Sequence, residues 1–374
     1  MASRGGAFAL CSLLQLASLQ GAAAAAPLAP AIFVFGDSTV DVGNNNYLPK
    51  CDADCKADHP RFGVDYLDHA PTGRFSNGYN LADQLAQLLG FPGSPPALLS
   101  LPNASLVSQM SSTGINFASG GSGLLNQTGG PDVCGEVLPM SAQVQSFKTL
   151  AQLWGSKDQA AADRISKSLI FISVGSNDLF EYSDATPDPS RDDAEFLQGL
   201  VTSYTSYLKD LYSVGARRFS VVSPSLVGCC PSQRLIGKKR NDLDKFGCLG
   251  MANNLSTQLN PMIASMLHNL SAELSGMSYS LGDSIAMAEW VFTSSHTPAY
   301  DFTVLDSACC GTGEFNASGC SISVPLCQNR TSYLFWDEYH LSEAATAVVA
   351  NELFGDTGLF VHPINVQQLV TSQP

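Results

Sequence analysis

Charged side chains are scarce in this chain of 374 residues, and basic ones are the scarcest. Asp, Glu, Lys and Arg make up 14% of the sequence, with 19 basic residues against 33 acidic ones and a formal net charge of −14. So few cations exclude the basic surface that binding to nucleic-acid phosphates requires. The same balance is a poor match for anionic membrane surfaces. We therefore expect no nucleic-acid partner, and the acidic charge favours solubility.

Long apolar runs are also missing after the N-terminus, where no stretch approaches the roughly 18 residues that suggest a membrane span. Arg4 is the only charge among the first 36 residues, and it precedes the apolar run AFALCSLLQLASL and then GAAAAAP. A short apolar run before small residues is typical of a signal peptide, and an uncleaved anchor is the alternative. We expect residues 1–26 to be a signal peptide that is cut near Ala25 or Ala26. The mature protein would then be secreted, with no stable membrane insertion.

Repeated CxxC pairs are absent as well, which argues against a zinc site. The chain has 11 cysteines, of which Cys11 would leave with the signal peptide. An even number in a secreted chain predicts disulfides, although the spacing does not give their pairing. The two Cys-Cys dipeptides suit bridges that pin loops. The remaining cysteines are Cys51, Cys55, Cys134, Cys229, Cys230, Cys248, Cys309, Cys310, Cys320 and Cys327.

Six Asn-X-Ser/Thr sequons are present, somewhat more than chance would give. Each is an acceptor for a glycan only in a secreted chain. Glycans would help to solubilise a surface with little charge. The sequons start at Asn103, Asn126, Asn254, Asn269, Asn316 and Asn329.

Short apolar runs alternate along the chain with longer segments of helical periodicity. The runs are Ile32–Phe35, Ile115–Ala118, Leu169–Val174, Phe219–Val222 and a weaker Tyr279–Leu281. Most are continuously apolar, as expected of strands that are buried on both faces. Strands that alternate with helices predict an α/β fold, a parallel sheet with helices on both faces.

No internal repeat, low-complexity linker or block of charge divides the chain. We therefore expect one domain over residues 27–374. Three irregular stretches contain cysteines, and we expect them to be disulfide-pinned loops over the active edge of the sheet. These stretches are Pro49–Thr72, Val227–Gly250 and Thr297–Asn329.

Polar residues follow the first three runs, where ligands of parallel sheets bind. Ser38 follows the first run in Gly36-Asp37-Ser38, at a strand-to-helix corner where a serine can attack a carbonyl. Gly121 lies in GINFASGGSG after the second run, and its amide could donate to an oxyanion. Asn177 follows the third run, and an amide side chain is a good oxyanion donor. A helix cap, a glycine turn and a turn-capping Asn are the alternatives.

The segment YLFWDEYHLSEAA carries Asp337 and His340, three residues apart, so that both side chains can face the same way. Such a pair can activate a serine, with His340 taking its proton and Asp337 orienting the imidazole. Activity should then fall below roughly pH 6, as the histidine becomes protonated. Among the other histidines, His59 and His69 lie in the first irregular stretch, where either could line the substrate site.

A second Gly-Asp-Ser tripeptide, Gly282-Asp283-Ser284, follows the weak last strand. It has no glycine-rich or Asn-containing loop beside it that could complete an active site. We therefore expect Ser38, and not Ser284, to be the nucleophile.

In these segments the chain resembles the plant-type GDSL esterase/lipase family of the SGNH hydrolase superfamily. The resemblance covers nearly all of the mature chain and is strongest in FVFGDSTVDVGNNN, TGRFSNGYNLAD, GINFASGGSGLL, VGSND and FWDEYHLSEAA. It implies a flavodoxin-like three-layer α/β/α fold without a metal or other cofactor. It also implies that Ser38 is the nucleophile and an oxyanion donor, with Gly121 and Asn177 as further donors. Asp337 and His340 would complete the catalytic triad.

Two positions depart from the pattern of the family. Thr39 replaces the leucine that gives the family its name, and Leu341 follows the histidine where proline is commoner. Neither position is expected to carry chemistry.

The function implied is hydrolysis of carboxylic esters through an acyl-enzyme, outside the cell or in the cell wall. Substrates would be small-molecule, lipid or polysaccharide esters, from acetylated wall polysaccharides to long-chain lipids. An acyltransferase with the same acyl-enzyme is one alternative, and a secreted binding protein with a silent site is another.

Overall fold

The computed structural model describes residues 26–185, 190–293 and 302–372. All of the expected signal peptide except Ala26 lies outside these ranges, and so do Cys11 and His296. No helix in the described ranges combines the length and the apolar character that crossing a membrane demands.

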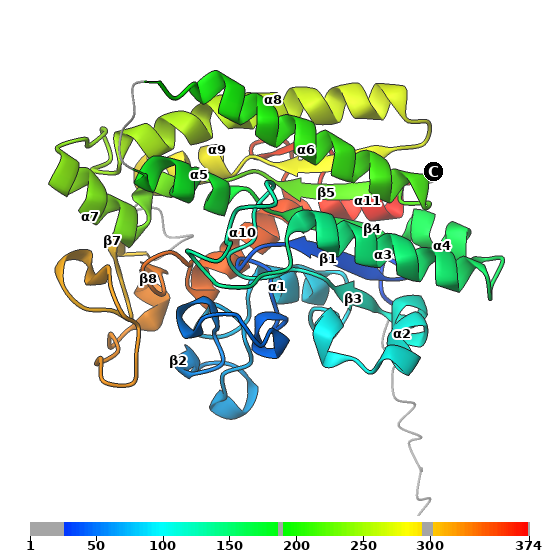
Figure 1. The fold of residues 1–374 in the computed structure, drawn as a ribbon, viewed down its shortest axis with the longest axis horizontal. Helices are drawn as coiled ribbons and strands as arrows, with labels where there is room; N and C mark the ends of the chain where they lie inside the picture. The colour runs from blue at the N-terminus through cyan, green and yellow to red at the C-terminus, as the bar shows by residue number, and fades with distance from the viewer. Residues whose placement is uncertain (1–25, 186–189, 294–301, 373–374) are drawn as a thin grey trace, which may run out of the picture.

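Six strands of the described chain form a central sheet in the order β3-β1-β4-β5-β6-β9 (Figure 1). The first five are parallel, and β9 runs antiparallel to β6 at one edge. The five runs predicted as strands are thus confirmed, whereas β9 was not expected. The bounds are β1 Ile32–Gly36, β3 Gly114–Asn116, β4 Leu169–Ser173, β5 Arg218–Val222, β6 Ser278–Gly282 and β9 Val361–Pro363.

Helices cover both faces of the sheet, so the predicted three-layer α/β architecture is confirmed (Figure 1). One face packs against α3 (Met140–Gly155), α6 (Asp193–Ser213) and α8 (Gly250–Glu273). The other packs against α1 (Leu81–Leu88), α10 (Glu343–Gly355) and α11 (Val366–Thr371). The remaining helices are α2 Leu106–Ser112, α4 Ala161–Lys167, α5 Ser176–Asp184, α7 Pro231–Arg240 and α9 Ser284–Thr293.

Burial on both faces explains why the strands are continuously apolar. In β1, Phe33 and Phe35 point into the core on the α3 side, whereas Ile32 and Val34 point into the core on the α1 side. All four side chains are at most 2% exposed. A strand with only one buried face would alternate between apolar and polar residues instead.

The carboxyl ends of the parallel strands are level with one another. Gly36 pairs with Ser173, Ser173 with Val222, and Val222 with Gly282. Residues that follow these four positions therefore gather along one edge of the sheet, where the sequence places Ser38 and Asn177.

The three stretches expected to be irregular are pinned by disulfides, but each of them also holds regular structure. Helix α7 lies inside the second stretch, beginning with Pro231 at its first turn and ending before Asn241 in a left-handed conformation. Its sequence PSQRLIGKKR has too few apolar residues to show a helical period. Strand β7 (Val304–Ala308), in the third stretch, pairs with β8 (Tyr333–Phe335), and the short β2 (Pro60–Gly63) lies in the first.

Eight of the ten cysteines in the described chain form disulfides, as predicted for a secreted protein. Cys51 and Cys230 remain free and buried, so the expectation from an even count holds only in part. Both cysteines of the dipeptide Cys309-Cys310 form disulfides, whereas only Cys229 of Cys229-Cys230 does. The bridges are Cys55–Cys134, Cys229–Cys248, Cys309–Cys327 and Cys310–Cys320.

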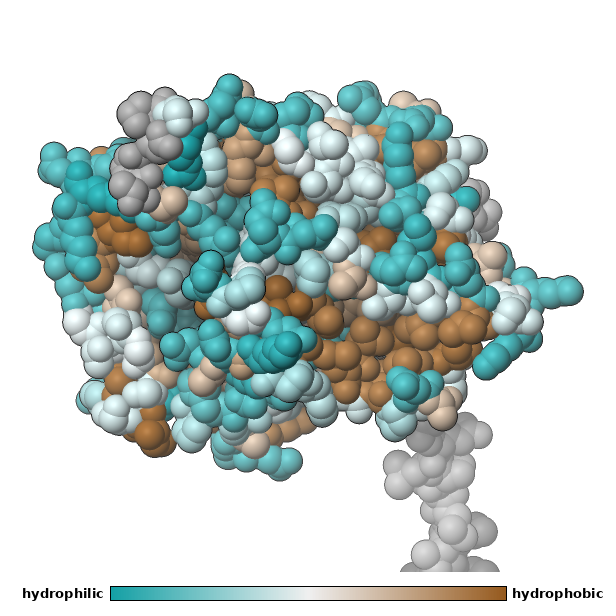
Figure 2. All heavy atoms as spheres, viewed as in Figure 1, coloured by the Kyte–Doolittle hydropathy of each residue, from teal (hydrophilic) through white to brown (hydrophobic). Residues whose placement is uncertain are grey.

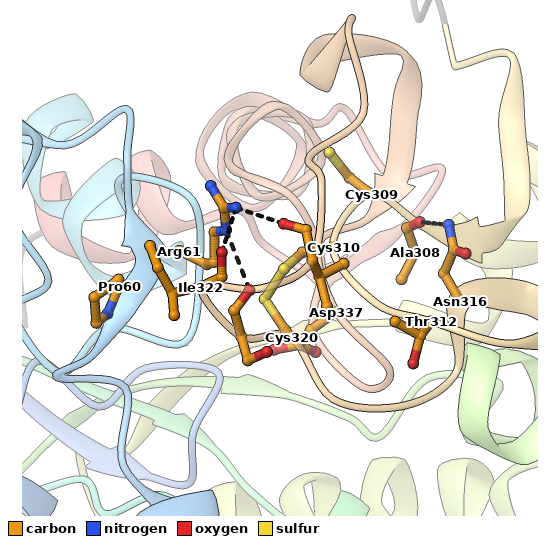
Figure 3. Close-up of a disulfide and its surroundings, with 12 residues drawn as sticks. Pro60, Arg61, Ala308, Cys309, Cys310, Thr312, Asn316, Cys320, Ile322 and Asp337 are labelled. Atoms are coloured by element: carbon orange, nitrogen blue, oxygen red, sulfur yellow. Dashed lines mark hydrogen bonds between the residues drawn. A yellow bond between two sulfur atoms is a disulfide. The ribbon is translucent and has the colours of Figure 1, made fainter.

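The surface is polar although it carries little charge. In the view of Figure 2, hydrophilic and intermediate residues cover most of the molecule, and apolar ones gather mainly over α2 and the chain before it. Five of the six sequon asparagines are exposed. Asn316 is the exception, because it is half-buried and its side-chain amide donates to the Ala308 carbonyl over 2.8 Å (Figure 3). Of the six, it is therefore the least suited to carry a glycan.

Candidate active site

Ser38 lies two residues beyond the end of β1, where the chain leaves the sheet. The turn depends on Gly36, whose φ is +144° and whose backbone passes so close to β4 that a Cβ would lie 1.9 Å from the Ser173 carbonyl oxygen. Only glycine fits this position. The side chain of Ser38 is 8% exposed and opens into a large cavity above the sheet edge.

The imidazole of His340 lies between Ser38 and Asp337. Its Nε2 is 2.8 Å from the Ser38 Oγ, and its Nδ1 is 2.8 Å from each carboxylate oxygen of Asp337. The backbone amides of Tyr339 and His340 also donate to Asp337 Oδ1, over 2.9 and 2.7 Å. The structure thus brings Ser38 together with His340, 302 residues further along the chain, and with the neighbouring Asp337.

The turn that carries Asp337 and His340 is supported from behind. Trp336 donates its backbone amide to the His340 carbonyl over 2.7 Å, and its carbonyl accepts from the Cys310 amide over 2.8 Å. Cys310 is bridged to Cys320 beside Asp337 (Figure 3). Arg61 donates to the carbonyl oxygens of residues 321, 322 and 324 and so ties the same loop to the N-terminal part of the chain (Figure 3).

Burial lowers the pKa of His340, but the charge of Asp337 and its hydrogen bond to the ring outweigh that effect, and the pKa lies above its usual 6.5. The carboxylates of Glu338 and Asp37 act in the same direction. Phe75 covers the ring, with its centroid 4.9 Å from that of the imidazole. Water is thereby kept from one face of the base, which strengthens its electrostatic contacts.

Asp37, between Gly36 and Ser38, is buried and bound to Thr39. Its Oδ1 accepts from the Thr39 amide over 3.0 Å and from the Thr39 hydroxyl over 2.7 Å. Burial raises the pKa of Asp37 to about 6. The Thr39 hydroxyl also lies 2.8 Å from the Ser173 hydroxyl. Thr39 therefore links the nucleophile turn to β4, a contact that a leucine at this position could not make.

Gly121 lies in the glycine-rich loop after β3 and lines the same cavity. Its φ is +82°, and a Cβ there would lie 2.5 Å from the Cys134 Sγ of the Cys55–Cys134 bridge. The loop is held by Asp178, whose carboxylate accepts from the amides of Leu124 and Leu125 over 2.7 and 3.0 Å. The disulfide and this carboxylate fix where the Gly121 amide lies.

Asn177 lies in the first turn of α5 and also lines the cavity. Its side-chain amide donates to the Ser122 carbonyl over 2.9 Å, which leaves its second hydrogen available to a ligand. Asn177 and Asp178 are adjacent, so the same helix turn carries the amide and anchors the Gly121 loop.

Gln143 on α3 is a supporting residue that sequence analysis missed. Its Oε1 accepts from the Gly36 amide over 2.9 Å, and its Nε2 donates to the Gly36 carbonyl over 2.9 Å. The side-chain amide thus pairs with both the N–H and the C=O of Gly36, as the backbone of a neighbouring strand would. It lies in an ordinary amphipathic helix, and no local signal in the sequence marks it.

The second Gly-Asp-Ser tripeptide lies at the start of α9. Asp283 caps α9, its Oδ1 accepting from the amides of Ile285 and Ala286 over 3.1 and 3.0 Å. Ser284 lines the cavity, and its backbone amide donates to the Ser223 hydroxyl over 3.2 Å. It forms no hydrogen bond with a histidine in the described chain. His59 lines the cavity, whereas His69 is exposed and lies outside it.

The sequence model of the GDSL-like lipase/acylhydrolase family matches residues 32–353, which is most of the chain. The chain belongs to this family. GDSL esterase/lipase At5g55050 of Arabidopsis thaliana is 35% identical over 350 residues, which are 92% of this chain and 90% of the relative. GDSL esterase/lipase LTL1 of the same plant is 31% identical over 345 residues, 90% and 89% of the two chains. GDSL esterase/lipase 7, also from Arabidopsis, is 32% identical over 362 residues, 92% of each chain.

Membership of the GDSL family makes this protein a hydrolase of the SGNH type that acts on carboxylic esters. The fold agrees with this assignment, because the sheet and its flanking helices form the expected α/β body. Among the described residues, no group of three His, Cys, Asp or Glu side chains is placed to hold a metal ion.

Proposed function

We propose that this GDSL protein is a secreted serine esterase or lipase in which Ser38, His340 and Asp337 form the catalytic triad. The observation that carries the proposal is the unbroken chain of contacts from the Ser38 hydroxyl through both ring nitrogens of His340 to the Asp337 carboxylate, each of 2.8 Å. Nucleophilic serine catalysis needs this arrangement, because a serine hydroxyl is a weak nucleophile until a base accepts its proton.

The reaction has two halves. The Ser38 Oγ attacks the carbonyl carbon of the ester while His340 Nε2 takes the hydroxyl proton, and the carbonyl electron pair moves onto the oxygen. The tetrahedral intermediate then collapses, the alcohol leaves with the proton from His340, and an acyl-enzyme remains. In the second half, water attacks the acyl carbon while His340 Nε2 takes a proton from it. The acid then leaves, and the proton returns to the Ser38 Oγ. Asp337 keeps the proton of the neutral ring on Nδ1 and stabilises the imidazolium.

The oxyanion of the intermediate would be bound by the backbone amides of Ser38 and Gly121 and by the Asn177 side chain. Within the described chain, neither of the two backbone amides donates a hydrogen bond to another protein group. Both are therefore available to a ligand. Loss of one such donor typically costs about 3 kcal/mol of transition-state stabilisation.

Replacing Gly121 by alanine is expected to lower kcat by roughly tenfold or more, because the new methyl group displaces the amide from the oxyanion. The control is Gly358→Ala, since Gly358 also has a positive φ, of +104°, but no atom within 4 Å of a Cβ. Both variants carry backbone strain, and only the first should lose turnover of p-nitrophenyl acetate. Equal kcat values in the two would exclude Gly121 as a donor.

The acid limb of the pH profile should lie higher than the sequence alone suggested. His340 must be neutral to accept the proton, and its pKa is raised. We expect kcat/KM to be half-maximal above pH 6.5 and to fall about tenfold per pH unit below that point. Glu338→Gln removes a charge that raises the pKa of His340, so it should move the limb to lower pH. A wild-type midpoint well below 6.5, or a shift to higher pH in the variant, would contradict this assignment.

Secretion, with residues 1–26 as signal peptide and 27–374 as one domain, is supported by the four disulfides and by the exposed sequons. Sequencing the N-terminus of protein exported by a plant host should find it at Ala26 or Pro27. Retention of Met1 would show that no cleavage occurs.

Incubation with p-nitrophenyl acetate and glycerol tests hydrolysis itself. We expect free acetate in amounts equal to the p-nitrophenol released, because water takes up the acyl group. Glyceryl acetate as the main product would assign acyl transfer instead.

A further inference from the structure

The cavity that contains Ser38 is far larger than an acetyl group requires. Its volume is about 1030 Å³, at the upper end of the roughly 300–1,000 Å³ of typical ligand pockets. From Ser38 it extends along the sheet edge over the carboxyl ends of β4, β5 and β6, reaching Ser173, Val222 and Ser284. Helices α9 and α10 form its walls in that direction.

The two parts of the cavity differ in chemistry. On the side of the N-terminal loops and the Cys310–Cys320 loop, the lining includes the polar residues Asp54, His59, Ser318 and Ser321 beside apolar ones such as Phe62 and Phe75. On the side of α9, α10 and β8 it is predominantly apolar. We call this part the apolar slot and define it by Met287, Ala288, Val291, Phe302, Leu334 and Val348.

The walls of the apolar slot are parts of the packed interior rather than scattered surface residues. Phe302 and Leu334 are 5% and 8% exposed, and Val291 and Val348 pack against them in one hydrophobic cluster. Met287 is 7% exposed and belongs to the core on the α1 side of the sheet. Binding a hydroxyl-rich ligand in such an apolar space would leave its hydroxyls without hydrogen-bond partners, which is unfavourable. Binding a hydrocarbon chain there buries apolar surface and is favourable.

We propose that the apolar slot binds the acyl chain of the ester, and that the natural substrates carry medium or long aliphatic acyl groups rather than acetyl groups. The inference rests on the proposed function, since the acyl carbon must be bonded to Ser38 in the acyl-enzyme. The polar part of the cavity then faces the alcohol portion of the ester. An acetyl ester would leave the slot without any contact to the substrate.

Burial of each added methylene in such a slot favours the transition state by up to about fourfold in kcat/KM. Between p-nitrophenyl acetate and p-nitrophenyl octanoate, six methylenes are added. We therefore expect kcat/KM to be at least about 100-fold higher for the octanoate, measured below its critical micelle concentration.

Ala288→Phe places a ring in the apolar slot and should lower the octanoate-to-acetate ratio of kcat/KM at least tenfold. Ala347→Phe is the matched control, because Ala347 lies on α10 outside the cavity and outside the hydrophobic clusters. It should keep the wild-type ratio. An unchanged ratio in Ala288→Phe, or equal losses in both variants, would overturn the proposal.

Val348→Ala removes atoms instead of adding them, so it provides the test if Ala288→Phe does not fold. It should move the optimum to longer acyl chains. Acetates of alcohols from ethanol to decanol form the second series, and their rates should depend little on length. If the rate follows the alcohol chain and not the acyl chain, the slot binds the leaving group and the proposal is wrong.

Failure of this inference can be told apart from failure of the proposed function. If Ser38 is needed for hydrolysis but kcat/KM is higher for p-nitrophenyl acetate than for the octanoate, only the assignment of the apolar slot to the acyl chain is wrong. If Ser38→Ala leaves the hydrolysis of both esters intact, the catalytic proposal falls as well.

Discussion

Replacing Ser38 by alanine is expected to reduce kcat for p-nitrophenyl acetate by about 10⁴-fold or more. In the proposed mechanism the Ser38 Oγ forms the acyl-enzyme, and the substitution removes this atom while the proposed oxyanion donors and the cavity stay in place. Ser38 is 8% exposed and its hydroxyl bonds only to His340 Nε2 in the described chain. The loss of that one contact should leave the melting temperature nearly unchanged.

The matched control is Ser284→Ala, which makes the same change in the other Gly-Asp-Ser tripeptide. Ser284 begins α9 and forms no hydrogen bond with an imidazole in the described chain, so kcat should change by less than about tenfold. If Ser284→Ala inactivates the enzyme and Ser38→Ala does not, the two serines have been assigned the wrong way round.

Asp337→Asn is expected to reduce kcat by about 10⁴-fold while preserving the fold. Asp337 Oδ1 accepts from the amides of Tyr339 and His340, and an asparagine oxygen can keep both bonds. The amide group cannot, however, stabilise the imidazolium, and its NH₂ favours the tautomer that leaves Nδ1 rather than Nε2 as the acceptor. The pKa of His340 should also fall, since the charge of Asp337 raises it.

Glu338→Gln serves as the control for Asp337→Asn, because it removes a neighbouring carboxylate that does not touch the ring in any contact described. Its effect on kcat at the pH optimum should be less than about tenfold. A similar loss in both variants would show that general electrostatics, and not the hydrogen bond to Nδ1, accounts for the role of Asp337.

The strands and the sheet edge were predictable because parallel strands buried on both faces leave a simple pattern. Five short runs, four of them near-continuously apolar, marked β1, β3, β4, β5 and β6, and the carboxyl ends of β1, β4, β5 and β6 lie level in the structure. That alignment is what brings Ser38 and Asn177 to one edge. The positions of Asp337 and His340 followed from their spacing and from the family resemblance.

Other features depend on contacts between distant segments, which no local pattern records. Strand β9 has three residues, of which only Val361 is buried. It therefore forms no apolar run that the sequence could show. Gln143 acts through Gly36, 107 residues away. Cys51 and Cys230 are free and buried, and the spacing of the cysteines does not distinguish them from those that form disulfides.

The apolar slot was also beyond the reach of sequence analysis. Its walls come from α9, α10, β8 and Phe302. The sequence of each of these segments is typical of an ordinary core element or loop. Only their packing leaves a space between them. The sequence therefore supported the reaction class, whereas the size of the acyl group became a testable question through the structure.

Labelling with a fluorophosphonate, followed by peptide mapping, tests the central claim most directly. The reagent phosphonylates a serine only where a base removes its proton and an oxyanion site binds the P=O group. If Ser38 is the activated nucleophile, the reagent should form one adduct per chain, on Ser38, that is lost in His340→Ala. An active enzyme that is labelled at another residue, or not labelled at all, would contradict it.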